Sequence, residues 1–374
     1  MSEWPMVKLG DLGEFINGFA FKPSDWSEDG TPIIRIQNLT NPQALFNRTT
    51  KRVKDVLYVE PGDLLVSWSA TLGVFRWQGK ERAELNQHIF KVVSKPIIEN
   101  EFLEFSLKFA LQQVEKYLHG ATMRHVNRQE FLDLKIPLPP LGEQKRIAEI
   151  LGGVSKAIHV VEQQIETANQ LEKSLFNQFR RQYSALCSPI KNICKVQTGA
   201  TPSRKNSAYY DGGIPWVKTG EVNGGKIEET EEYITELAVQ ETNCRKFPIG
   251  TILVAMYGQG ATRGKVGILN CAAATNQACA ALIALACEDQ EYIFAVLRNC
   301  YDELRNLGRG GTQPNLNLTL VKNFEIPWPE EFAREEFSQK WRELDNLRHL
   351  LHRKLSLLQE LQKSLANRAF AGLL

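Results

Sequence analysis

The stretch GEQKRIAEILGGVSKAIHVVEQQIETANQLEKSLFNQFRRQ, residues 142–182, decides how the rest of the chain is interpreted. Its apolar residues recur mostly at alternating steps of four and three, the heptad period of a coiled-coil seam. They are Ile147, Leu151, Val154, Ile158, Val161, Ile165, Ala168, Leu171, Leu175 and Phe179. The faces between them carry Glu162, Glu172 and Lys173, so we expect those faces to be exposed. At 1.5 Å per residue this helix would be roughly 57 Å long, which requires a partner along its seam.

A second long helix is predicted for residues 330–368, again with apolar residues at steps of three and four and one irregularity near Leu347. Its seam consists of Phe337, Trp341, Leu344, Leu347, Leu351, Leu355, Leu358, Leu361 and Leu365. We expect the two helices to form an intramolecular antiparallel coiled coil. The alternative, in which each helix only covers its own domain, stays open.

Composition restricts the class of protein. The chain has 374 residues, 43% hydrophobic and 24% charged, with a net charge of +2. These values are ordinary for a soluble protein of two or three domains, and any DNA contact must come from local basic patches. No apolar run is long enough to cross a membrane and no signal peptide is recognisable, so a cytoplasmic protein is expected. The seven cysteines form no CxxC pair, so no metal site is predicted, and Cys271, Cys279 and Cys287 are expected to be reduced core residues.

The chain is an internal repeat with an offset close to 190 positions. The Ile136-Pro137 pair matches Ile326-Pro327, and Asn86-Gln87 matches Asn276-Gln277. Gly120-Ala121-Thr122 matches Gly310-Gly311-Thr312 at the same offset. The repeat predicts four parts, namely a globular block at residues 1–141, a helix at 142–182, a second block at 183–329 and a second helix at 330–374.

Each block is expected to be an α+β domain built on a mainly antiparallel, barrel-like sheet. Short apolar runs bounded by Gly, Pro and Asn predict strands at residues 31–36, 63–68, 89–93, 250–256 and 267–269. One helix is predicted late in each block, at residues 101–118 and 290–307.

Three polar segments recur in both blocks and are candidates for DNA contact. They lie at residues 17–23, 67–73 and 118–127 of the first block and at 198–205, 257–265 and 308–317 of the second. They combine glycines, small hydroxyls, an amide and usually a cation, which suits phosphate oxygens and base edges. Turn chemistry alone explains the same residue types and remains the alternative for any single loop. The candidates in the first block are Lys22, Ser69, Thr71, Asn86, Gln87, Thr122, Arg124 and Asn127. Those in the second block are Thr201, Ser203, Arg204, Lys205, Lys218, Tyr257, Gln259, Thr262, Arg263, Lys265, Asn276, Gln277, Arg309, Thr312, Gln313 and Asn317.

Known catalytic motifs are missing, so no catalytic residue is predicted. The sequence has no GxSxG, HExxH or GxGxxG motif, and the glycines around Lys265 have the wrong spacing for a phosphate-binding loop. The acidic run at residues 228–232 would repel phosphate, so we expect it to face away from nucleic acid.

Together these features resemble the specificity subunit of a type I restriction–modification system. The resemblance covers essentially the whole chain and is carried by residues 136–148, IPLPPLGEQKRIA, preceded by Gly120-Ala121-Thr122 and followed by the heptad helix. In the second copy Gly311-Thr312-Gln313-Pro314-Asn315-Leu316 fits the family pattern, but Glu330-Glu331-Phe332-Ala333 departs from it because the Glu-Gln pair is missing.

The resemblance implies a non-catalytic subunit in which each block is a target recognition domain and the helices are spacers. It implies double-stranded DNA, two methyltransferase subunits and restriction subunits as partners, with S-adenosylmethionine, ATP and Mg²⁺ bound by those partners and no cofactor in this chain. Each domain would read one half of a bipartite, asymmetric target. The competing hypothesis is a coiled-coil scaffold with two protein-binding domains and no nucleic acid.

Overall fold

The computed structural model describes residues 4–41, 43–68, 71–118, 128–258, 260–307 and 315–374. It divides into two compact units, which comprise residues 1–162 with 353–374 and residues 163–352. Each unit holds one globular head and one half of each long helix, α5 (Leu141–Gln182) and α11 (Glu331–Phe370). The predicted starts of both helices lie within one residue of the observed starts. The end of α5 is as predicted, whereas α11 ends two residues after the heptad run at 330–368 and four residues before the predicted bound at 374.

The head of unit 1 contains two four-stranded sheets, with strand orders β2-β9-β6-β7 and β4-β3-β8-β5. A short pair, β1-β10, joins its ends. The strands are β1 (Met6–Lys8), β2 (Gly13–Asn17), β3 (Thr31–Ile34), β4 (Asn47–Thr49), β5 (Tyr58–Val59), β6 (Leu64–Ser67), β7 (Gly73–Arg76), β8 (Ala83–Leu85), β9 (Ile89–Ser94) and β10 (Lys135–Pro137). The helices are α1 (Leu9–Leu12), α2 (Ile36–Thr40), α3 (Asn100–Leu118) and α4 (Arg128–Leu132).

The head of unit 2 repeats this plan. Its sheets have the orders β12-β19-β16-β17-β14 and β15-β13-β18, and β11 pairs with β20 as β1 pairs with β10. The strands are β11 (Cys187–Pro189), β12 (Cys194–Thr198), β13 (Tyr210–Val217), β14 (Lys226–Ile227), β15 (Tyr233–Ile234), β16 (Ile252–Ala255), β17 (Val266–Leu269), β18 (Ala274–Thr275), β19 (Cys279–Ala284) and β20 (Glu325–Pro327). The helices are α6 (Ile190–Ile193), α7 (Glu236–Glu241), α8 (Gln290–Asn299), α9 (Tyr301–Asn306) and α10 (Leu318–Asn323).

The sheets differ in one respect from the prediction. Most pairs are antiparallel, but β3 and β8, β13 and β18, and β14 and β17 run parallel. In the described part of the chain every sheet has two free edges, so none closes into a barrel. The predicted strand at 31–36 is shorter, because Ile36 begins α2, and the predicted helix at 290–307 is interrupted at Cys300.

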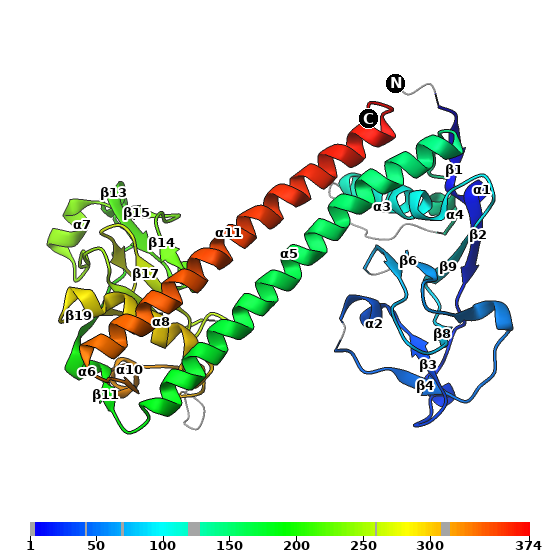
Figure 1. Ribbon diagram of the computed structural model, residues 1–374. Helices are drawn as coiled ribbons and strands as arrows, with labels where there is room; N and C mark the ends of the chain where they lie inside the picture. Colours follow the sequence, from blue (N-terminus) through cyan, green and yellow to red (C-terminus); the bar gives the residue numbers. More distant parts are fainter. Residues whose placement is uncertain (1–3, 42, 69–70, 119–127, 259, 308–314) are drawn as a thin grey trace. The chain divides into compact units, whose positions relative to one another are not determined.

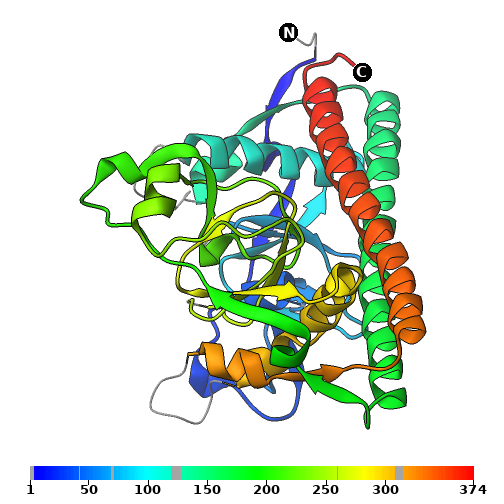
Figure 2. The same ribbon diagram turned by 90° about the vertical axis from the view of Figure 1, so that its left-hand side faces the viewer.

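Within each unit, segments of α5 and α11 lie side by side (Figures 1 and 2). In unit 1, Ile147 and Leu151 share a core with Leu365 and Phe370. In unit 2, Phe176 and Phe179 share a core with Phe337 and Trp341. The first half of α5 therefore meets the second half of α11, and the reverse, which makes the pairing antiparallel. Among the described residues, no helix has the length and apolarity needed to cross a bilayer.

The seam departs from the prediction at one layer. Glu172, expected on an exposed face, is 7% exposed, whereas Leu171 is 54% exposed. Strict alternation of three and four from Ala168 leads to Glu172, so a carboxylate occupies a seam position. Leu347 and Leu361 are exposed in the same way, and Asp345 is buried.

A glycine pair lies within α5, and the cysteines differ in burial. Gly152 and Gly153 are adjacent inside α5, and a Cβ at either position would meet no atom within 4 Å. Of the cysteines expected in the core, Cys279 is buried, but Cys271 is half-buried and Cys287 is exposed.

Candidate nucleic-acid interface

In the head of unit 1, two of the three recurring segments meet where strands end. Gly18 follows β2, and its backbone approaches Asn86 so closely that a Cβ would overlap the Asn86 carbonyl oxygen. The backbone N–H of Phe19 donates to Leu85 and that of Gln87 donates to Phe19, at 2.8 and 2.9 Å. This contact explains why the turn requires glycine and brings the Asn17 turn and the Asn86-Gln87 segment together.

The end of β6 joins the same place. The ring of Trp68 stacks on Phe90 with centroids 5.6 Å apart and meets the ring of His88 edge-on at 5.2 Å. Phe90 is also the ladder partner of Asn17. The structure therefore gathers the ends of β2 and β6 and the start of β9 at one end of the sheet.

Several buried polar atoms at this end of the sheet have no hydrogen-bond partner among the described residues. They include Asn17 Oδ1, Asn86 Oδ1 and the indole Nε1 of Trp68. Buried polar groups in folded proteins are nearly always paired, so unpaired ones at a strand end mark a place where a partner is expected. Asn17 and Trp68 were not selected from the sequence as site residues, although both lie in the recurring segments.

The head of unit 2 repeats the arrangement with different side chains. Gly199 follows β12, and a Cβ there would overlap the carbonyl oxygen of Thr275. The hydroxyl of Thr201 donates to Oε1 of Gln277 at 2.6 Å. A direct bond thus joins the turn that contains Thr201 to the Asn276-Gln277 segment.

The acidic run forms ion pairs with two of the predicted contact residues. Arg204 forms an ion pair with Glu232 at 2.6 Å, and Lys218 pairs with Glu231 at 2.7 Å and with Glu232 at 3.2 Å. The hydrogen bond from Arg204 lowers the pKa of Glu232, so its carboxylate stays charged. These ion pairs show that the run lies beside two of the basic candidates, and its orientation relative to nucleic acid stays a prediction.

The loop between β16 and β17 carries two cations, Arg263 and Lys265, that are not compensated. Tyr301 of α9 donates its hydroxyl hydrogen to the carbonyl of Ala261 at 2.8 Å, which ties the loop to the helix. Within the described residues neither Arg263 nor Lys265 forms an ion pair, and Nε of Arg263 is covered and unpaired. This loop therefore presents positive charge that remains available to phosphate.

The side chains of two candidate residues form local hydrogen bonds to the backbone, one in a turn and one at a helix N-terminus. The side-chain oxygen of Asn276 accepts from the backbone of Ala278, and that of Asn317 caps α10 by accepting from Leu320 at 2.9 Å. Their amides have local structural roles.

The other described candidates lie mostly on the surface. The exposed ones are Lys22, Thr71, Gln87, Ser203, Lys205 and Tyr257, while Thr262 is half-buried. Eight candidates lie outside the described residues, namely Ser69, Thr122, Arg124, Asn127, Gln259, Arg309, Thr312 and Gln313. Over the described ranges, no group of three His, Cys, Asp or Glu side chains is arranged to hold a metal ion.

Comparisons with known proteins agree with this architecture. The sequence model of the type I restriction modification DNA specificity domain matches residues 1–170 and 187–359. The chain is 23% identical over 400 residues to the MjaVIII specificity subunit of Methanocaldococcus jannaschii, covering 99% of this chain and 92% of that protein. It is 28% identical over 175 residues to the EcoBI specificity subunit of Escherichia coli, covering 46% and 36% of the two chains.

Solved structures share the fold. The type I restriction-modification S subunit from M. genitalium superposes with a TM-score of 0.61 at 14% identity, covering 98% of this chain and 96% of that one. A chain from a study of complex assembly and conformational transition in the type I R-M system gives a TM-score of 0.58 at 13% identity, covering 99% and 98%. With a four-strand order shared by both heads and a family match over each, the chain belongs to the type I restriction modification DNA specificity family and carries that family's domain twice.

Proposed function

We propose that this chain is the DNA sequence-specificity subunit of a type I restriction–modification complex, in which each head reads one half of a bipartite target. The observation that carries the proposal is the repeat itself, because two heads that share the strand orders β2-β9-β6-β7 and β12-β19-β16-β17 present different side chains on equivalent loops. Proteins with two DNA-reading heads recognise two half-sites at a set spacing. Since the loops differ, the two half-sites are expected to differ in sequence.

The residue-level proposal is that residues 1–141 and 183–329 act as the target recognition domains. In the second, the unpaired cations Arg263 and Lys265 would contact phosphates. Arg204 and Lys218 share their charge with Glu231 and Glu232, so we assign them a weaker part in DNA affinity.

Exchange of the loop at residues 257–265 tests the reading role. We expect the variant, expressed with its methyltransferase subunits, to methylate a target in which only one half has changed. Methylome mapping of the host gives the result, and an equivalent exchange of residues 67–73 serves as the matched experiment on the other head. A change in both halves from either exchange would contradict the assignment of one half-site to each head.

The long helices are proposed to dock two methyltransferase subunits. Exposed apolar residues recur at equivalent positions of the repeat, with Val160 matching Leu350 and Leu171 matching Leu361. Unit 1 therefore carries Val160 and Leu361, and unit 2 carries Leu171 and Leu350. Exposed large apolar side chains at matched places favour two equivalent protein-binding sites.

Charge substitution in one unit tests this stoichiometry. The double variant Leu171→Glu with Leu350→Glu is expected to bind one methyltransferase subunit where the unmodified chain binds two, measured by light scattering of the purified complex. Gln164→Glu with Gln178→Glu adds the same charge at exposed polar positions of α5 and is expected to leave two subunits bound. Equal loss in both variants would mean that charge alone, and not these leucines, determines docking.

We further propose that the chain is not itself an enzyme and that S-adenosylmethionine, ATP and Mg²⁺ are bound by its partner subunits. The low net charge of +2 is the one observation that favours a scaffold without nucleic acid. Salt dependence separates the two functions, because phosphate contacts make DNA affinity fall steeply as salt rises. A complex whose DNA retention does not change with salt would support the scaffold.

A further inference from the structure

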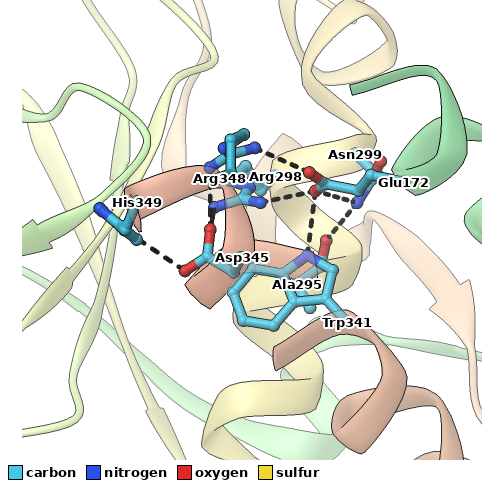
Figure 3. Close-up of polar contacts among 8 residues, drawn as sticks. All are labelled: Glu172, Ala295, Arg298, Asn299, Trp341, Asp345, Arg348 and His349. Carbon is cyan, nitrogen blue, oxygen red and sulfur yellow. Dashed lines mark hydrogen bonds and ion pairs between the residues drawn. The ribbon is translucent and has the colours of Figure 1, made fainter. Parts of the chain in front are cut away.

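A closed ring of charged side chains lies at the junction of the unit 2 head with the long helices (Figure 3). Arg298 of α8 donates to Glu172 of α5 at 2.6 Å and to Asp345 of α11 at 2.8 Å. Arg348 of α11 bonds the same two carboxylates at 2.7 and 2.8 Å. Two arginines and two carboxylates alternate around the ring, so each charge has opposite neighbours on both sides.

Further donors complete the environment of Glu172. Its Oε1 also accepts from the indole N–H of Trp341 at 3.0 Å and from Asn299 at 3.3 Å. The side chain of Arg298 is 12% exposed and that of Glu172 is 9% exposed. Buried charges of this kind hold their geometry because any departure leaves a charge without a partner in a low-dielectric site.

Open space adjoins the ring on two sides of this junction. A hollow of about 490 Å³ is bordered by Glu172, Arg298 and Arg348 together with Asn223 and Gly224 of the head. A second hollow of about 260 Å³ is bordered by Trp341 and Asp345 of α11 and by residues of the head that include Gly225 and Ile268. The ring therefore adds to the apolar core in which Phe294 of the head packs on Trp341 of α11.

The repeat supplies an internal comparison. The positions equivalent to Glu172 and Asp345 are Gln362 and Ser155, which also meet, through one neutral hydrogen bond of 2.8 Å. The position equivalent to Arg298 is Lys108, whose amino group pairs with Glu104 on its own helix α3. The unit 1 head packs on the long helices through aromatic rings, as the unit 2 head does, with Phe109 and Phe370 centroids 4.4 Å apart.

We propose that Arg298 is a positioning residue that fixes the orientation of the second head on the spacer helices and so sets the permitted gap to its half-site. This inference rests on the proposed reading of a bipartite target. A gap longer or shorter by one base pair turns the half-site by roughly 35° and moves it by about 3.4 Å. A head held rigidly cannot follow that displacement, so the DNA must deform and the altered target is disfavoured.

Arg298 can be replaced without isolating a buried carboxylate. In Arg298→Leu, Glu172 keeps Arg348, Trp341 and Asn299 as donors, and Asp345 keeps Arg348. The ion pairs that Arg298 makes to both long helices are lost, whereas Asn299, Glu291 and Phe294 still join α8 to α5 and α11. Arg298→Lys keeps the charge but lacks the planar fork that reaches two carboxylates at once.

The test measures methyl transfer by the full complex to duplexes that carry the mapped target with its gap unchanged, shortened by one base pair or lengthened by one. The probe is S-adenosylmethionine with a labelled methyl group, and assays run below the lowest thermal midpoint of the variants. The unmodified complex is expected to prefer the natural gap by about tenfold or more. Arg298→Leu should reduce that preference at least about threefold, with a smaller reduction for Arg298→Lys.

Lys108→Leu is the matched control, because it removes a cation at the equivalent place of the first head without breaking a contact to the long helices. Its gap preference should equal that of the unmodified complex. A variant that only loses stability would change activity on all gaps alike, so an unchanged preference in Arg298→Leu overturns the proposal. If that variant does not fold, an unchanged preference in Arg298→Lys overturns it equally. If no bipartite target maps for the unmodified complex, the proposed function fails first and this inference fails with it.

Discussion

Gln144 and Arg334 occupy equivalent places in the repeat, and both join the first turn of a long helix to a head. The amide of Gln144 accepts from the backbone N–H of Glu99 and donates to the carbonyls of Ile97 and Pro139. Arg334 binds Asp289 and donates to the carbonyl of Pro329, the equivalent of Pro139. The second copy thus departs from the Glu-Gln pattern in sequence but retains the connection.

Gln144→Leu should lower the free energy of unfolding by about 1–3 kcal/mol, because the part-buried backbone groups of Glu99 and Ile97 and the buried carbonyl of Pro139 lose this partner. Urea unfolding of the full chain measures the change. Gln178→Leu, an exposed glutamine of the same helix, is expected to change stability by no more than about 0.5 kcal/mol. Similar losses in both variants would assign the effect to the added apolar surface.

Glu84 is expected to make the folding stability of the chain depend on pH. Its side chain is buried in β8, 1% exposed, and neither carboxylate oxygen has a well-formed hydrogen bond. Burial raises the pKa of Glu84, an effect that the neighbouring Tyr58 hydroxyl only partly offsets. The folded state therefore favours the protonated form, so this residue's stabilising contribution is present below the unfolded pKa and is lost as pH rises through the folded pKa.

Glu84→Gln should raise the thermal midpoint relative to the unmodified chain at pH 7 and have little effect at pH 4, where the carboxyl is protonated in both states. Calorimetry at the two pH values gives the comparison. Exposed Glu28→Gln is the control, because Glu28 forms no ion pair within the described residues, and it is expected to show no such difference between the two pH values. A gain for Glu84→Gln that is the same at both pH values would show that ionisation is not the cause.

At the scale of elements, two adjacent leucines of α11 lie on different faces of the helix, one in the core and one on the surface. Leu351 is 9% exposed and Leu350 is 66% exposed. Leu351→Ala should destabilise the chain by about 2–5 kcal/mol, since it leaves a cavity in the seam. Leu350→Ala should change stability by about 0.5 kcal/mol or less. Chemical denaturation of the two variants measures the difference, and equal effects would mean that the seam runs along another face.

Elements with a strong period could be predicted from the sequence, and long-range partnerships could not. The heptad pattern gave α5 and α11 because helical order depends on residues three and four positions apart. It could not place Glu172 in the seam, since a carboxylate is stable there only with Arg298, Arg348 and Trp341, which lie more than a hundred positions away. The break at Cys300 carries no Gly or Pro signal, and the reach of Glu232 to Arg204 depends on how strands pair.

At the scale of the whole molecule, the proposed spacer role predicts how the target changes with helix length. Removal of one heptad from α5 and one from α11 shortens each helix by about 10.5 Å, equal to about three base pairs of B-DNA. We expect the gap in the mapped target to shorten by about three base pairs with both half-sites unchanged. Removal of a heptad from α5 alone puts its apolar residues out of register with those of α11, and this variant should not assemble with the partner subunits. An unchanged gap in the double deletion would reject the spacer role.

The glycine pair in α5 has a mechanical consequence. Each of Gly152 and Gly153 makes its helical turn about 0.8–1 kcal/mol less favourable than alanine would, and no neighbouring atom would obstruct an alanine side chain. We therefore expect this turn to be the part of the α5 interior that bends and unfolds locally most easily. Hydrogen–deuterium exchange should label this turn earliest in the interior of the helix, and alanine at both positions should slow that labelling.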